Sequence, residues 1–360
     1  MKKQLFASIL LLCSLQLFAR GKAELPMPSE SNDYTSIDTE EPVPEEEDEG
    51  ALLPKYTYRQ PEGNPVQLKE SWGYVSQVYP EEYNSDIPLT DVCFFSAEVN
   101  SYGELVGVPN RAKLKTNARV HMVITCESTA LTHFILDPKS ETRKQLLRQI
   151  VKAAKPYDGV QIDFELVPVR DRKNFILFLG DLRYMLGKDK WFSVCVPARF
   201  RQLQEDVYPY AEIAKYCDRV FIMAYDEHWS TSAPGPVASV EWCRKVMDYA
   251  IKSIPSKKLI MGVPFYGRTW GNEKTDKAWY FESIDKKMTE KKVEEVFYEN
   301  DIPMFKYTTE VEVTGYMNDI YSVLQLCRLY EQAGIHKVGY WRIGMEDPNF
   351  WNWIKINKSL

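Results

Sequence analysis

The sequence predicts an α/β fold, a (β/α)8 TIM barrel with an insertion between its seventh and eighth strands. Eight apolar runs of strand length occur over roughly 290 residues, and amphipathic stretches separate them. The chain has 360 residues, of which 44% are hydrophobic, and this suits one large barrel plus a tail. No glycine-rich phosphate loop follows the first run, which argues against the alternative of a doubly wound open sheet.

The first segment, residues 1–23, is predicted to be a signal peptide. Lys2 and Lys3 precede an apolar run, Leu5–Leu17, that is short for a permanent bilayer span. A small residue for cleavage stands at Ala19 or Ala23. Lipid attachment at Cys13 is an open alternative, although the residue before such a cysteine is usually small and here it is a leucine. We therefore expect a secreted protein or one of the cell envelope.

Residues 24–53 are predicted to be a disordered acidic tether. The part from Glu24 to Glu49 holds 11 acidic residues and no basic one, and it is poor in aliphatic side chains. Such a composition buries too little apolar surface to order itself.

The eight predicted strands follow the tether. Most of them are continuously apolar and rich in β-branched residues, as is typical of parallel strands covered by helices. They are Trp72–Val78, Asp91–Ala97, Arg119–Cys126, Gly159–Glu165, Trp191–Val196, Arg219–Tyr225, Lys258–Pro264 and Lys337–Ile343.

Helices are predicted between these strands where apolar residues recur at helical spacing. The connection over about residues 271–319, between the seventh and eighth strands, is unusually long, and we expect an insertion there on the active-site face. The helical candidates are Ser140–Ala154, Asp171–Leu186, Ser239–Ser253 and Ile320–Ala333.

Charge and cysteine usage exclude several classes of function. The net charge of −6 offers no basic footprint, so we expect no nucleic-acid partner. Four histidines and six cysteines beyond Cys13 form no CxxC pair and no metal-ligand spacing, so we expect no metal and no cofactor. Three cysteines, Cys93, Cys126 and Cys195, lie within predicted strands, which is typical of buried free thiols.

The most informative stretch is 157–165, Tyr-Asp-Gly-Val-Gln-Ile-Asp-Phe-Glu. Side chains alternate along a strand, so Gln161, Asp163 and Glu165 point to one side of it. In a barrel this aims two carboxyls and an amide at the interior, near the carboxyl ends of the strands. Two such close carboxyls cannot easily both ionise, so one proton stays available near neutral pH. A strand with a solvated polar face is the alternative, but the apolar flanking residues favour burial.

This stretch resembles the DGxDxDxE signature of glycoside hydrolase family 18, the chitinase family. Further similarities follow in the order of that family's strands and cover most of residues 71–350. They are Trp72-Gly73-Tyr74 for the opening strand, residues 220–226 for the M-x-Y-D motif of the sixth strand, residues 262–268 for the G-x-P-x-Y-G-R motif of the seventh, and Val338-Gly339-Tyr340-Trp341 for the eighth.

The resemblance implies a substrate-assisted, retaining mechanism, for which this family is an exception to the rule of two catalytic carboxylates. Glu165 would protonate the glycosidic oxygen and later act as the base for water. The 2-acetamido oxygen of the substrate would attack the anomeric carbon. Asp163 would hold the acetamido N–H and offset the positive charge, and Tyr225 would orient the acetamido oxygen.

Further residues are implied to bind the substrate. Trp341 would form the floor under a sugar ring and Tyr74 would lie below it, with barrel core as the alternative for both. Tyr266 and Arg268 would either contact a sugar or brace the loop after the seventh strand. The whole implied set is Tyr74, Gln161, Asp226, Tyr266, Arg268 and Trp341.

The sequence departs from the family pattern at two places. Gln161 replaces the middle aspartate of the signature, as in relatives that act on bacterial cell walls, and it removes a charge that would couple to Asp163. The third strand ends in residues 124–128, Ile-Thr-Cys-Glu-Ser, without the S-x-G-G of the family, so that side of the site is not predictable.

These observations predict that residues 54–360 form a family 18-like catalytic domain, which we expect to be monomeric. It would cleave β-linked N-acetylglucosamine polymers, either peptidoglycan or chitin-type, with N-glycan cores also open. The main alternative is a non-catalytic, carbohydrate-binding chitinase-like protein, which retention of Glu165 disfavours. A scaffold or adhesin carried on the tether is a second alternative.

Overall fold

The computed structural model describes residues 58–274, 281–300 and 302–360. The predicted signal peptide (1–23), the possible lipid site at Cys13 and the predicted tether (24–53) lie outside these residues. Residues 60–360 form one compact unit. Within the described residues, no helix combines the length and the apolar character needed to cross a bilayer.

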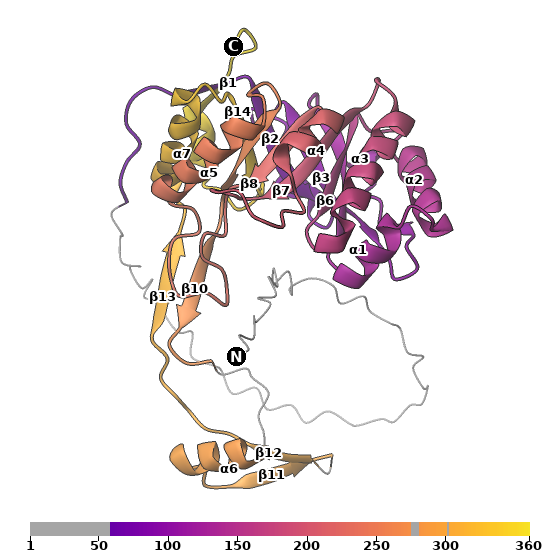
Figure 1. The fold of residues 1–360 in the computed structure, drawn as a ribbon. Coiled ribbons are helices and arrows are strands. Elements are labelled where there is room, and N and C mark those ends of the chain that lie inside the picture. Colours follow the sequence, from indigo (N-terminus) through magenta and orange to yellow (C-terminus); the bar gives the residue numbers. More distant parts are fainter. Residues whose placement is uncertain (1–57, 275–280, 301) are drawn as a thin grey trace, which may run out of the picture. The chain divides into compact units, whose positions relative to one another are not determined.

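Eight parallel strands close into a barrel, which confirms the predicted α/β TIM barrel (Figure 1). Each strand pairs in parallel with the next, and the last, β14, pairs with the first, β2. A two-residue strand, β4 (Leu105–Val106), adds to β3 in the antiparallel direction. The barrel strands are β2 (Glu70–Ser76), β3 (Asp91–Val99), β5 (Arg119–Cys126), β6 (Gly159–Phe164), β7 (Trp191–Pro197), β8 (Arg219–Met223), β9 (Leu259–Pro264) and β14 (Lys337–Trp341).

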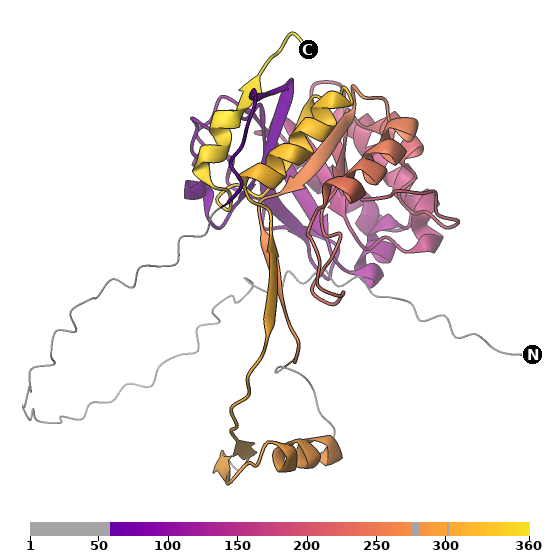
Figure 2. The ribbon, with the colours of Figure 1, turned by 90° about the vertical axis from the view of Figure 1, so that its left-hand side faces the viewer.

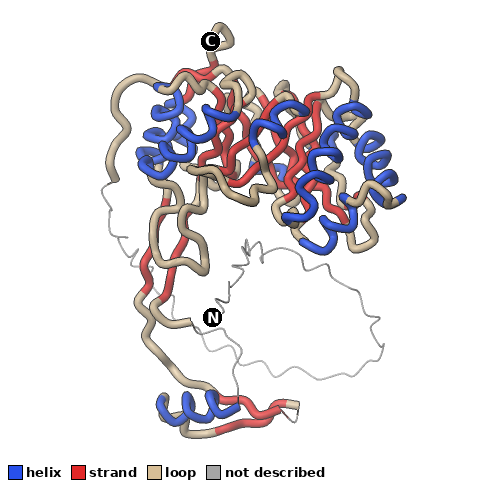
Figure 3. Tube along the Cα trace, viewed as in Figure 1, coloured by secondary structure: helices blue, strands red, loops and turns tan. Residues whose placement is uncertain are grey.

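The helices surround this barrel, and the four predicted helices all form (Figure 3). Several begin at a side chain that accepts a hydrogen bond from the first turn, for example Ser239 from the N–H of Trp242 and Asp319 from the N–H of Ser322. The helices next to the barrel are α1 (Thr129–Leu136), α2 (Glu141–Ala153), α3 (Arg172–Leu186), α4 (Tyr210–Tyr216), α5 (Val240–Ser253) and α7 (Ile320–Gln332).

Two connections of the barrel differ from the regular strand-helix alternation. The chain between β2 and β3 carries the 3-10 helix η1 (Pro80–Glu82), and the chain between β3 and β5 carries β4 and the 3-10 helix η2 (Arg111–Lys113). These connections contain Pro80, Pro88 and Pro109, which disfavour the interior of a regular helix.

Two apolar cores hold the barrel together. The outward side chains of the strands pack against the helices, for example Val160 and Ile162 of β6. The interior is filled by a smaller, separate cluster that includes Phe221. Gly339 of β14 lies so close to the Phe221 ring that a Cβ atom there would overlap it. The inner cluster consists of Trp72, Tyr74, Cys93, Val123, Cys195, Phe221 and Ile260. The three cysteines of the predicted strands are buried free thiols.

Several further elements separate β9 from β14 along the chain. β10 (Gly267–Gly271) and β13 (Val313–Met317) form an antiparallel pair, which Figures 1 and 2 show side by side. Between these two strands come α6 (Phe281–Glu290) and an antiparallel hairpin of β11 (Val296–Glu299) and β12 (Ile302–Phe305). That this insertion stands on the active-site face remains a prediction.

The first and last strands of the described chain pair in a short parallel ladder. β1 (Val66–Leu68) pairs with β15 (Ile354–Ile356), which follows the 3-10 helix η4 (Pro348–Trp353). The Lys69 ammonium donates a hydrogen bond to the backbone oxygen of Leu360. Lys69 directly precedes β2, so this ladder lies at the amino-terminal end of the barrel strands.

Candidate active site

Strand β6 carries the carboxyls and the amide that the sequence singles out. Gln161 and Asp163 are buried, with exposed fractions of 0% and 5%, and both lie on the inward face of the strand. Glu165 follows the last residue of β6 by one position and is half-buried. The alternation predicted from the sequence therefore holds, and the two carboxyls lie at the carboxyl end of the barrel.

Gln161 links β6 to β2 across the barrel and to the neighbouring strand β7. Its Oε1 accepts a hydrogen bond of 2.6 Å from the Tyr74 hydroxyl on β2, and its Nε2 donates one of 3.1 Å to Ser193 Oγ on β7. Both polar ends of the amide are thus used inside the barrel. Sugar contact by Gln161 stays a prediction, and the structure gives this residue a role in holding Tyr74.

Tyr74 lies at the centre of this arrangement. Its hydroxyl also contacts the Cys195 thiol at 3.2 Å, and its ring packs edge-on against Phe221 and Trp341, with centroid distances of 5.1 and 5.2 Å. Tyr74 is fully buried, and burial raises the pKa of its hydroxyl well above the ordinary value, so the group stays protonated. Tyr74 therefore belongs to the inner core and also supports Trp341.

Asp163 is a buried acid with an unmet hydrogen-bonding atom. Among the described residues its Oδ1 has no hydrogen-bond partner. Burial raises the pKa of the carboxyl well above its usual range, and the negative charges of Glu165 and Glu127 act in the same direction. An interaction with the Cys195 thiol opposes these effects. The protonated form of Asp163 is consequently favoured until a donor or a cation reaches Oδ1.

Tyr225 and Asp226 lie just beyond β8, which ends at Met223 rather than at Tyr225 as predicted. Asp226 has a positive φ of 58°, which turns the chain out of the extended conformation. Burial raises the pKa of the Tyr225 hydroxyl, and the Cys195 and Asp163 groups beside it add to the shift. Tyr225 is therefore a protonated hydroxyl near Asp163.

Asp226, Tyr266 and Arg268 form a cluster, as the sequence motifs place them. Asp226 Oδ1 accepts hydrogen bonds from the Tyr266 hydroxyl at 2.6 Å and from Arg268 Nη2 at 2.7 Å. The Tyr266 ring packs edge-on against Tyr225 at 6.4 Å. These contacts fix the loop that carries Tyr225, so bracing is observed and sugar contact remains a prediction.

Trp341 is the last residue of β14 and is partly exposed. Its ring stands edge-on to Phe95 of β3 at a centroid distance of 4.8 Å. The peptide bonds Phe95–Ser96 and Trp341–Arg342 are both cis. Stacking of a sugar ring on Trp341 remains a prediction.

Sequence reasoning missed four residues of this site. Ser193 and Cys195 alternate on β7 as Gln161 and Asp163 do on β6, and that alternation is the signal that finds them. Glu127, just beyond β5, has its pKa raised by burial and by the nearby charge of Glu98. Glu127 lies where the family pattern is lost, so no motif indicated it. Phe95, on β3, is the fourth.

The described residues contain no group of three or more histidine, cysteine, aspartate or glutamate side chains suited to a metal ion. The site thus consists of a carboxyl pair, buried hydroxyls and aromatic rings. Such a set supports proton transfer and the recognition of a polar, ring-shaped ligand.

Comparisons with known proteins agree with this arrangement. The family model described as "Glycosyl hydrolases family 18" matches residues 73–346. The chain is 32% identical over 231 residues to the "Uncharacterized glycosylase YvbX" of Bacillus subtilis. This alignment covers 59% of this chain and 65% of that relative. It is 25% identical over 296 residues to a "Cortical fragment-lytic enzyme" of Bacillus anthracis, covering 76% of this chain and 69% of the relative. For the "Putative sporulation-specific glycosylase YdhD" of Bacillus subtilis, the chain spans 54% of the relative's length.

Solved structures show the same fold. The spore cortex-lytic enzyme SleL of Bacillus cereus superposes with a TM-score of 0.65 at 23% identity, over 83% of this chain and 77% of that chain. A chitinase from Bacteroides thetaiotaomicron superposes with a TM-score of 0.58 at 20% identity, over 79% of this chain and 93% of that chain.

Proposed function

Because this chain belongs to glycosyl hydrolase family 18, we propose that it cleaves β-linked N-acetylglucosamine polymers by substrate-assisted, retaining hydrolysis. The family match and the similarity to cortex-lytic enzymes and chitinases support a carbohydrate substrate. The polymer, the bond that is cut and the mechanism are parts of the proposal.

The observation that carries the proposal is the buried Oδ1 of Asp163, which has no hydrogen-bond partner in the part of the chain that the structure describes. An acetamido N–H of the substrate would donate a hydrogen bond to this atom, and the positive charge that forms on the cyclised acetamido group would then face the Asp163 carboxylate. Both contacts favour the ionised form, which burial disfavours in the free protein. Asp163 would therefore ionise as the positive charge forms, and the carboxylate would stabilise the transition state.

The neighbouring groups fit the other steps. Glu165, half-buried at the end of β6, would donate a proton to the leaving oxygen and later take one from water. The Tyr225 hydroxyl remains protonated because its pKa is raised, and it would donate a hydrogen bond to the acetamido oxygen. Trp341 would provide a face for the sugar ring, since Tyr74 and Phe95 hold its ring from the side.

For the natural polymer we propose a peptidoglycan-type substrate. Support comes from the names of the Bacillus relatives, which refer to the spore cortex and its fragments, and from the amide at Gln161. Chitin-type oligosaccharides and N-glycan cores are the alternatives. We further propose that residues 1–23 direct export, so that the enzyme acts as a monomer outside the cell membrane or in the envelope.

Product analysis by mass spectrometry tests this proposal. The wild-type protein and Glu165→Gln are incubated separately with purified peptidoglycan, chitin oligomers and an N-glycosylated protein. We expect the wild type alone to release fragments with new N-acetylglucosamine reducing ends, and peptidoglycan to be cut fastest.

Two outcomes would contradict it. Binding of a polymer in a pull-down, without release of reducing ends by the wild type, would favour the non-catalytic alternative. Preferential cleavage of chitin oligomers or of the glycoprotein would leave the mechanism standing and would overturn the peptidoglycan assignment.

A further inference from the structure

The amino-terminal end of the barrel, opposite Glu165, is filled by charged side chains. Asp91 accepts two hydrogen bonds from the Arg119 guanidinium, at 2.7 and 2.8 Å. Glu70 accepts from Arg219, with a distance of 2.9 Å from Nε to Oε2. Both guanidinium groups lie near the Trp191 ring, with their carbons 4.1 and 4.8 Å from its centroid. Two carboxylates and two guanidinium groups thus balance one another.

Lys337, the first residue of β14, adds a positive charge to this balanced set. Its side chain is buried, with an exposed fraction of 7% for the residue. An ammonium group has three donors, and within the described residues Lys337 Nζ makes one hydrogen bond, of 3.3 Å, to the backbone oxygen of Ser256. Burial lowers the pKa of Lys337, and the nearby charges of Arg219 and Lys69 lower it further, whereas Glu70 opposes the shift.

A cavity of about 310 Å³ opens beside Lys337. Five of its six lining residues are cationic, and the one carboxylate, Asp218, already accepts hydrogen bonds from Arg183 and from the backbone N–H of Phe192, both at 2.9 Å. This volume is at the lower end of the range of ligand pockets, about 300–1,000 Å³. The cavity is lined by Lys69, Asp218, Arg219, Lys257, Lys258 and Lys337.

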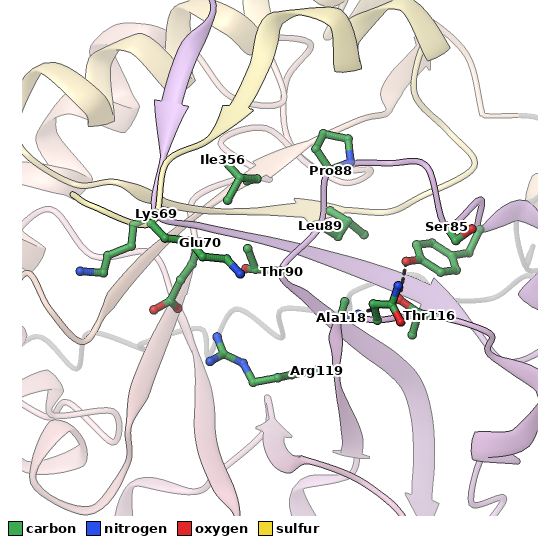
Figure 4. A pocket seen from close by; sticks show the side chains of 13 residues that line it. Lys69, Glu70, Ser85, Pro88, Leu89, Thr90, Thr116, Ala118, Arg119 and Ile356 are labelled. Atoms are coloured by element: carbon green, nitrogen blue, oxygen red, sulfur yellow. Dashed lines mark hydrogen bonds between the residues drawn. The ribbon is translucent and has the colours of Figure 1, made fainter.

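A second cavity, of about 550 Å³, adjoins the same end of the barrel and shares Lys69 with the first. Figure 4 shows Lys69 and Glu70 side by side at one end of this second cavity, with Arg119 extending toward Glu70 from the facing strand. Its lining is mixed, since Pro88, Leu89 and Ile356 contribute apolar surface. The concentration of positive charge is therefore a property of the smaller cavity.

We propose that the smaller cavity binds a phosphoryl group, either as free phosphate or as the phosphate of an ester. An anion there would accept hydrogen bonds from the under-satisfied ammonium of Lys337 and from Lys69 and Lys257. It would also offset the repulsion among these cations. Lysine ammonium groups bind phosphate as point charges, and partial burial strengthens the attraction because screening by water is reduced. The site is independent of the proposed hydrolysis, which takes place at the opposite ends of the strands.

The test measures the melting temperature (Tm) of the full chain, with inorganic phosphate and dimethyl phosphate as the two probes and chloride of equal ionic strength as the blank. Phosphate should raise Tm by about 5 °C at a concentration a hundredfold above its Kd, in a saturable way that chloride does not reproduce. Isothermal titration calorimetry should give one site per chain. A similar shift with dimethyl phosphate would identify an ester as an acceptable source, and a shift with phosphate alone would restrict the site to free phosphate or monoesters.

Lys337→Met separates a binding site from general charge effects. Methionine fills a similar volume without charge, so the variant should melt at a higher temperature than the wild type in chloride and should lose the phosphate-dependent shift. Lys252→Met, an exposed lysine on α5, is the matched control and should keep that shift. If Lys337→Met does not fold, Lys257→Met changes an exposed lysine of the cavity and should weaken phosphate binding at least threefold.

The absence of a saturable effect beyond chloride would overturn the proposal, and so would an unchanged phosphate shift in both cavity variants. Glu165→Gln should bind phosphate as the wild type does. Failure of the hydrolysis assays would therefore not count against the phosphate site. Failure of the phosphate assays would likewise not count against the proposed hydrolysis.

Discussion

At the scale of single residues, Glu165 and Asp163 divide the proposed chemistry between them. Glu165→Gln is nearly isosteric and replaces the ionisable carboxyl with an amide that can neither donate nor accept the catalytic proton. We expect turnover to fall by about a hundredfold to ten-thousandfold, the usual contribution of general acid-base catalysis, with folding and sugar binding largely kept. Steady-state kinetics together with a binding isotherm for a chitin oligomer would check this. Turnover like that of the wild type would remove Glu165 from its role.

Asp163→Asn should increase stability while it reduces turnover. The folded-state pKa of Asp163 is raised above the unfolded value, so the ionised carboxyl destabilises the folded protein. Below the ordinary pKa of aspartate, about 3.8, the carboxyl is neutral in both states, and the variant and the wild type should melt alike. As pH rises from there toward the raised pKa, the wild type should lose stability relative to Asp163→Asn. Thermal melts from pH 4 to pH 8 test this; a constant difference in Tm would contradict it.

The acetamido group of the substrate is the third participant at this scale. If it supplies the nucleophile, matched substrates without it, such as a glucoside or a de-N-acetylated glucosaminide, should not be cleaved. A thiazoline mimic of the cyclised intermediate should bind about a hundredfold or more tightly than substrate, and Asp163→Asn should weaken that inhibition. Rates for the matched substrates and inhibition constants are the measurements. Efficient glucoside cleavage, or a sugar covalently trapped on Asp163, would mean that the protein supplies its own nucleophile.

At the scale of elements, the close approach of β14 to the inner core depends on a glycine. A Cβ at Gly339 would overlap the Phe221 ring, which is fully buried, so the packed core around it would have to shift. Gly339→Ala should therefore lower the free energy of unfolding by about 1–3 kcal/mol, as overpacking does. Gly180→Ala on α3 is the control: its Cβ would lie 3.2 Å from the partly exposed Tyr216 ring, and alanine favours helices. Urea unfolding compares the two; equal effects would contradict the assignment.

The elements also mark how far the sequence alone predicts the structure. The barrel strands were predictable because both faces of such a strand are buried, which gives a continuous apolar run in the sequence. The predicted and observed bounds of β5 are the same. β1 and β15 were not predicted, because three residues carry little periodicity and their pairing joins positions far apart in the sequence. The end of β8 was placed two residues late, because the positive φ of Asp226 leaves no trace in an apolar run.

The candidate site was predictable only where a single strand carries it. The alternation of Gln161, Asp163 and Glu165 follows from strand geometry. The contact of Tyr74 with Cys195 depends on the register of strands 121 residues apart, which no local pattern fixes. The buried amide of Gln161 likewise finds its partners on other strands.

At the scale of the whole molecule, residues 26–50 should be dispensable for catalysis. Their acidic composition provides no apolar core and a single aromatic residue, Tyr34. A truncated protein beginning at Leu52 should keep its Tm within the error of the melt and its turnover on soluble oligomers. Thermal melts and steady-state kinetics compare the truncated protein with the protein that begins at residue 24. A large loss of either property would show that this segment packs on the barrel.

The ladder of β1 with β15 also decides how this protein can be attached to a surface. Because this ladder and the Lys69–Leu360 contact place β1 and Leu360 at the amino-terminal end of the barrel strands, coupling through Leu360 holds that end of the barrel toward the support. An immobilised preparation then points Glu165 and Asp163 away from the support, toward an insoluble polymer that cannot diffuse to the enzyme. Linkage through surface lysines, which lie on many sides, would give no such uniform orientation.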